Sequence, residues 1–217
     1  MTAERSGSIP LQSLLVPAVL TLAITLLRLI GELQNWPSAL FSKAPGGAGA
    51  IVGIVWLVPI FGIYFASVLA RSGTAPGAGR VIGYSLLAFA LVAASAFTAV
   101  GLLKLSQNGQ FLVIFLACVL AAWVAYLGWP ALGRALLTYG LLARVPVAIV
   151  MLVAIFANWG THYDVPPPNF PAMEPFLKWV YIGFLPQMFL WVPFTMFVGG
   201  LFAGFTLLVV GRKSAAA

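Results

Sequence analysis

The sequence predicts an all-α integral membrane protein: a polytopic bundle of six transmembrane helices, with both termini in the cytoplasm. Hydrophobic residues make up 62% of the 217 residues, and charged residues make up only 7%. The mean hydropathy is +1.07. A soluble domain carries about 25% charged residues, so this chain has too few of them to cover a water-facing surface. Long apolar segments recur along its whole length, which indicates one transmembrane helical domain over 1–217.

Six segments approach the length of about 20 apolar residues that a helix needs to cross a hydrocarbon core. Continuously apolar stretches such as 114–122 favour helices over the alternating strands of a β-barrel. Pro146 interrupts the fifth segment, so residues 131–144 either begin that span or lie along the membrane surface. In the last segment we expect an interfacial piece near 173–184 and a kink at Pro193. The spans are approximately 9–31, 50–70, 81–103, 110–128, 131–159 (bent at Pro146) and 180–211, and an outer loop covers 160–179.

The distribution of Lys and Arg predicts the orientation, because cytoplasmic loops carry an excess of these residues. Six spans place both termini on one side, and that side collects seven basic residues against three on the other. We therefore expect cytoplasmic termini, and we prefer the bacterial inner (plasma) membrane as the location. The seven are Arg5, Arg71, Arg80, Arg134, Arg144, Arg212 and Lys213, and the three are Lys43, Lys104 and Lys178.

Polar residues at the outer ends of the first and fifth spans are the candidate ligand-binding residues. Arg28 and Glu32 are four residues apart and share a helix face, and charges inside a membrane are often functional. His162, Tyr163 and Asp164 follow the fifth span. We predict that all five surround one outward-facing pocket. The alternative is a structural one, in which Arg28 and Glu32 anchor the helix at the interface and the loop caps a helix end.

Several kinds of chemistry are not expected from this composition. One histidine and one cysteine in an apolar stretch make a poor zinc site, so we predict neither a metal nor a cofactor. The GxSxG motif of serine hydrolases is missing from the sequence. Basic residues are scattered singly, which argues against nucleic acid as a partner. Acidic residues are missing from the middle of the spans, where an ion-coupled transporter normally carries them.

Small residues four apart predict close contacts between helices. Gly200 and Gly204 have this spacing in the last span, and Ala90 and Ala94 have it in the third. The spacing is common in membrane proteins. It fits packing within the chain as well as a homo-oligomer.

We therefore expect a multi-pass membrane protein that binds a small ligand, a lipid headgroup or a partner protein at its non-cytoplasmic face. One alternative is a permease or channel subunit, which requires a polar path between both faces. A second is a membrane-embedded enzyme acting on a lipid-like substrate, which requires His162 within about 3.2 Å of a carboxylate or nucleophile. An enzyme is the less favoured reading. The binding hypothesis requires the first and fifth spans to be neighbours at their outer ends.

Overall fold

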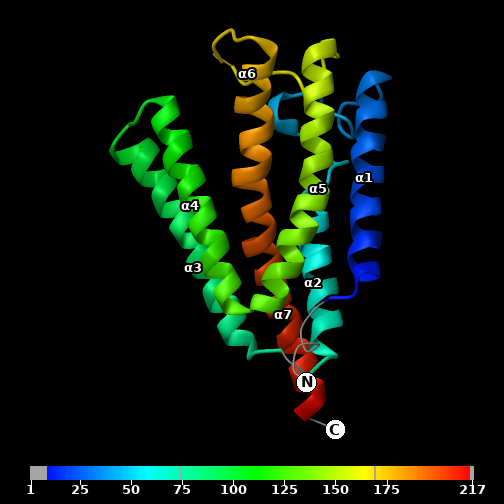
Figure 1. Cartoon of the computed structure of the whole chain (residues 1–217), viewed down its shortest axis with the longest axis vertical. Coiled ribbons are helices and arrows are strands. Elements are labelled where there is room, and N and C mark those ends of the chain that lie inside the picture. The colour runs from blue at the N-terminus through cyan, green and yellow to red at the C-terminus, as the bar shows by residue number, and fades with distance from the viewer. Residues whose placement is uncertain (1–8, 74, 169, 216–217) are drawn as a thin grey trace, which may run out of the picture.

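The computed structural model describes residues 9–73, 75–168 and 170–215, which form helices and loops without strands (Figure 1). The all-helical prediction is confirmed. Among the described residues, five helices are long and apolar enough to cross a membrane. They are α1 (Leu11–Leu33), α3 (Ala78–Ala96) continued by the π-helical η2 (Phe97–Leu102), α4 (Gln107–Gly128), α5 (Pro130–Ala157) and the run Pro175–Val210.

The second predicted span is only partly helical. Helix α2 (Leu57–Ala70) has 14 residues, which extend about 21 Å and fall short of a hydrocarbon core of about 30 Å. Residues 51–56 form bends and turns instead of the expected first turns of a helix. The segment before them is rich in glycine, and Gly46, Gly47 and Gly49 have positive φ angles that end regular structure. Helix length alone therefore supports five spans.

The fifth segment is one helix, α5, with Pro130 in its first turn and Pro146 inside it. Arg144 lies near the middle of this helix and is only 4% exposed. Its guanidinium carbon lies 4.8 Å from the centre of the Trp191 ring. The alternative in which residues 131–144 lie along the membrane surface does not fit Arg144, because this residue lies on the helix face that packs inward with Val147 and Ala148. Without Arg144, the side predicted to be cytoplasmic carries six basic residues instead of seven.

The last segment is one helical run, which we call the composite helix. It consists of α6 (Pro175–Trp179), the π-helical η3 (Val180–Phe184) and η4 (Gln187–Trp191), and α7 (Val192–Ala215). Each π-helical stretch ends two residues before a proline, Pro186 and Pro193. Proline lacks an amide N–H and its ring clashes with the preceding turn, so the wider π turns let the helix continue past it.

The bundle divides into a packed lower half and a more open upper half in the view of Figure 1. In the lower half, α2, α5 and α7 pack around fully buried side chains that include Phe65, Leu136 and Tyr139. In the upper half, the hairpin of α3 and α4 diverges from α1 and α5 (Figure 1). The beginning of α1 and the end of α7 lie toward the same end of the molecule.

The glycines of the last span lie against α3 within the same chain. A Cβ atom at Gly200 would lie 2.7 Å from Ser85 Oγ, and one at Gly204 would lie 2.6 Å from Ile82 Cγ1. Only glycine permits this approach of α7 to α3. Ala90 and Ala94 are exposed on the outside of the bundle. The two small-residue pairs therefore lie in different environments.

Candidate functional site

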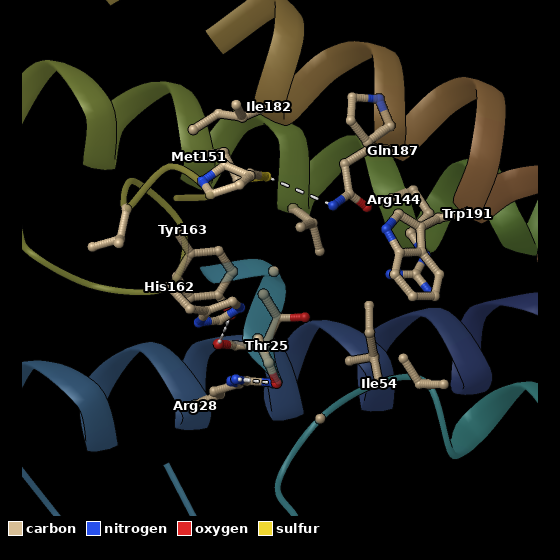
Figure 2. Close-up of a pocket in the computed structure, with 18 of the residues that line it drawn as sticks. Thr25, Arg28, Ile54, Arg144, Met151, His162, Tyr163, Ile182, Gln187 and Trp191 are labelled. Carbon is tan, nitrogen blue, oxygen red and sulfur yellow. Dashed lines mark hydrogen bonds between the residues drawn. The ribbon is translucent and has the colours of Figure 1, made fainter. Parts of the chain in front are cut away.

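A cavity of about 280 Å³ lies in the upper half of the molecule (Figure 2). Helices α1 and α5, the composite helix and the segments 46–55 and 162–170 contribute to its wall, and Phe111 of α4 completes it. Most lining side chains are apolar. Four lining residues carry a guanidinium, imidazole or amide group: Arg28, Arg144, His162 and Gln187.

Glu32 joins helix α1 to the loop after α5. Its carboxylate is fully buried, and Oε1 accepts hydrogen bonds from Arg28 Nε at 2.9 Å and from His162 Nδ1 at 2.5 Å. Oε2 accepts a bond from the His162 backbone N–H at 2.8 Å. A carboxylate can only accept, so the imidazole carries its proton on Nδ1 and leaves Nε2 as an acceptor when it is neutral. Residues 130 positions apart thus form one cluster.

Arg28 also holds the irregular segment that precedes α2. Its Nη2 atom donates to the carbonyls of Ser42 and Gly47, each at 3.1 Å. A Cβ atom at Gly47 would lie 3.0 Å from both Arg28 Nη2 and His162 Cδ2, and its φ of +77° also favours glycine. Non-helical backbone is tolerated at membrane depth only where it is buried in protein or lines a cavity. The Arg28 guanidinium satisfies two backbone carbonyls of this segment, those of Ser42 and Gly47.

Asp164 stabilises its own loop and does not line the cavity. Its carboxylate accepts hydrogen bonds from the backbone N–H groups of Gly160 at 2.9 Å and Thr161 at 2.7 Å. The Thr161 hydroxyl donates a third bond at 2.7 Å. These bonds hold the chain in the turn that brings His162 to Glu32. Of the five predicted site residues, Arg28, His162 and Tyr163 line the cavity, whereas Glu32 and Asp164 do not and instead hold Arg28, His162 and the loop in place.

His162 and Tyr163 enter the bundle from this loop. The Tyr163 hydroxyl donates to the Thr25 carbonyl at 3.1 Å, and its ring is buried against Leu29 and Met151. Burial raises the pKa of the Tyr163 hydroxyl, so it stays a donor at neutral pH. Burial lowers the pKa of His162 below its ordinary value of 6.5, because desolvation outweighs the attraction of Glu32. The imidazole is therefore neutral at pH 7.

Arg144 is the charged group that the sequence analysis did not assign to the site. Its Nε atom is buried and has no hydrogen-bond partner among the described residues. The ion pairs of the described residues join Glu32 to Arg28 and to His162, and none includes Arg144. The face of the Trp191 ring is its main contact. The helical spacing of Arg144 with the buried Val147 and Met151 is the signal that could have identified it.

Gln187 of the composite helix lies beside Arg144 at the inner end of the cavity (Figure 2). Its side chain is buried, with 7% of the residue exposed. The amide Nε2 donates to Met151 Sδ at 3.6 Å, while Oε1 has no partner among the described residues. Figure 2 shows this oxygen turned toward Arg144 and Trp191. An unpaired donor and an unpaired acceptor therefore belong to two residues that line the same cavity.

Two further observations bear on the chemistry of this site. Helices α1 and α5 pack against each other, and His162, in the loop after α5, bonds to Glu32 near the C-terminal end of α1. Within the described residues, no group of three or more His, Cys, Asp or Glu side chains could hold a metal ion. Comparison of the chain with protein-family models, characterised proteins and solved structures found no match.

Proposed function

We propose that this membrane protein binds a small organic anion in the cavity between α1, α5 and the composite helix. The observation that carries the proposal is Arg144, a guanidinium that is 4% exposed and has an unpaired buried Nε. A buried charge without a partner destabilises a protein by several kcal/mol. An anion in the cavity would pair with Arg144 and remove that cost.

The charges around the cavity favour a ligand with one negative charge. Arg28 and Glu32 form an ion pair and cancel each other. His162 is neutral at pH 7 because burial lowers its pKa. Arg144 therefore leaves one positive charge in the site.

The apolar part of the wall favours a ligand with an apolar body. Ile24, Ile54, Val147 and Ile182 line the cavity together with aromatic rings. The volume of about 280 Å³ is near the lower limit for ligand pockets, which is roughly 300 Å³. A single aromatic ring bearing one acidic group has suitable size and chemistry.

We further propose that the cavity opens to the outside of a bacterial plasma membrane. The ends of α1 and α7 that lie together in Figure 1 share their side with Arg71, Arg80 and Arg134. An excess of basic residues favours the cytoplasmic side. In this orientation α2 and residues 50–56 together make the second of six crossings, and Arg28 donates to the carbonyls of Ser42 and Gly47 in the loop that precedes them.

The packing of the lower half argues against a permease. A permease needs a polar path to both faces, whereas below the cavity Phe61, Phe65 and Leu136 form a tightly packed cluster. The hydroxyls of Thr21 and Tyr139 bond to each other there at 2.9 Å. Thr21 and Tyr139 thus satisfy each other inside the packed cluster.

An enzyme is the second candidate function, and the pair of His162 and Glu32 favours it. A carboxylate that orients an imidazole is the arrangement of a general base, here with Nε2 as the basic nitrogen. In the described residues, no serine, threonine or cysteine side chain bonds to the imidazole. Such an enzyme would therefore have to activate water. Binding requires no group beyond those already present.

Binding of aromatic acids to the full-length protein in neutral detergent tests the main proposal. Isothermal titration calorimetry with phenylacetate and mandelate is expected to show binding, and neutral benzyl alcohol is expected to bind at least tenfold more weakly. Arg144→Met should weaken binding of the acids by roughly 10- to 150-fold, since a hydrogen bond to a charged group contributes about 1.5–3 kcal/mol. Arg134→Met changes an exposed arginine on the same helix and should bind as the wild type does. Equal binding by Arg144→Met would overturn the proposal.

A further inference from the structure

We propose that the anionic group of the ligand also carries a hydroxyl donor, as in a 2-hydroxy carboxylate or a phosphate monoester that retains its acid proton. This inference rests on the proposed function and names the ligand class for the same site. It follows from two unpaired atoms at the inner end of the cavity, the donor Arg144 Nε and the acceptor Gln187 Oε1.

The orientation of the Gln187 amide follows from its other contact. Met151 Sδ lies 3.6 Å from Nε2, and a thioether sulfur can accept a hydrogen bond but cannot donate one. The NH₂ group therefore faces Met151, and Oε1 faces the opposite way. Figure 2 shows Oε1 on the side of Arg144 and Trp191. We therefore expect the anionic group of a ligand bound to Arg144 to face a second protein atom, the acceptor Gln187 Oε1.

The two protein atoms require different things of a ligand. Arg144 can only donate, so it requires an acceptor, and its charge favours an anion. Gln187 Oε1 can only accept, so it requires an O–H or N–H group. A plain carboxylate or a sulfate ester satisfies Arg144 but turns only acceptors toward Gln187. A 2-hydroxy acid or a protonated phosphate monoester satisfies both residues.

A water molecule both donates and accepts hydrogen bonds, so a ligand that enters this end of the cavity competes with water for both residues. A ligand that displaces this water must replace both of its hydrogen bonds or lose affinity. Leaving one buried acceptor unpaired corresponds to a loss of roughly 5- to 150-fold in affinity. Gln187 therefore selects among anions that Arg144 alone would bind equally.

Matched pairs of probes test this selection on the full-length protein in neutral detergent. Mandelate is compared with phenylacetate, which lacks the 2-hydroxyl group. At pH 6, where much of a phosphate monoester keeps its acid proton, phenyl phosphate is compared with phenyl sulfate. Calorimetry should show tighter binding of the hydroxyl-bearing member of at least one pair, by roughly 5- to 150-fold. The pair that shows the larger ratio identifies carboxylate or phosphate as the natural head group.

Substitution of Gln187 tests whether its Oε1 atom is responsible for the preference for hydroxyl-bearing ligands. Gln187→Met removes the acceptor while keeping a side chain of similar size, and it should reduce the ratio within each pair to less than about twofold. Gln12→Met, at an exposed position of α1, should leave the ratios unchanged. Equal binding within both pairs by the wild type would overturn this inference and leave the proposed function standing. So would a ratio that survives in Gln187→Met, since another acceptor such as His162 Nε2 would then be responsible. Failure of all four acids to bind would overturn the proposed function itself.

Discussion

Glu32→Gln is expected to destabilise the folded protein strongly. The carboxylate is fully buried and accepts three hydrogen bonds, from Arg28 Nε, His162 Nδ1 and the His162 amide. Glutamine keeps one oxygen as an acceptor, but its NH₂ group would face donors. Arg28 would remain buried without a negative partner. Removing one member of a buried ion pair costs about 3–5 kcal/mol.

The assay is thermal unfolding of the purified protein in detergent, followed by tryptophan fluorescence. For a chain of this length, 1 kcal/mol corresponds to about 2–4 °C, so the apparent Tm should fall by roughly 6–20 °C. Glu174→Gln removes an exposed acid from the same outer region and serves as the matched control. Its Tm should stay within about 2 °C of the wild-type value, because exposed charges contribute little.

A double variant distinguishes charge from general disruption. The double variant Arg28→Met, Glu32→Gln lacks the guanidinium that Glu32→Gln alone would leave buried without a partner. Its loss of stability should therefore be smaller than the sum of the two single losses. The reasoning is refuted if Glu32→Gln unfolds at the same temperature as Glu174→Gln. Strict additivity of the two single effects would show that the Arg28–Glu32 ion pair is not the source of the lost stability.

The remaining predictions concern pH and topology. Burial places the pKa of His162 below its ordinary value of 6.5, so the unfolded chain takes up a proton first as the pH falls. Stability should therefore be highest above about pH 6.5 and should decline as the pH falls from there toward the folded pKa, below which both states bind the proton and the loss stops. In the folded protein Glu32, Arg28 and Asp164 face the imidazole. His162→Asn should give a flatter Tm profile between pH 7.5 and 5.5, and identical slopes would contradict the lowered pKa. In a background with Cys118→Ala, an exposed cysteine from Pro171→Cys should react with an impermeant maleimide added to intact cells. Labelling only after lysis would invert the proposed orientation.

Part of the candidate site could be predicted from local spacing. Arg28 and Glu32 lie one helical turn apart, and the outer end of the fifth span was expected to bring His162 toward them. The structure places these groups within hydrogen-bond distance. Spacing did not predict the inward turn of Asp164, because loop hydrogen bonds depend on the φ and ψ angles of the turn. The Asn158 cap with a φ of +51° and Gly160 at +64° begin that turn.

The composition by itself determined that the chain is helical and suited to a membrane, since backbone groups in lipid must bond within their own segment. Only the tertiary structure decided which polar side chains share a cavity. Arg144 looked like one more basic residue near the inner surface, and α5 instead carries it into the bundle. Gln187 acquired its significance from Met151 on another helix. Such pairings join residues far apart in the chain, and the energy of a buried charge or acceptor depends on those distant neighbours rather than on adjacent residues.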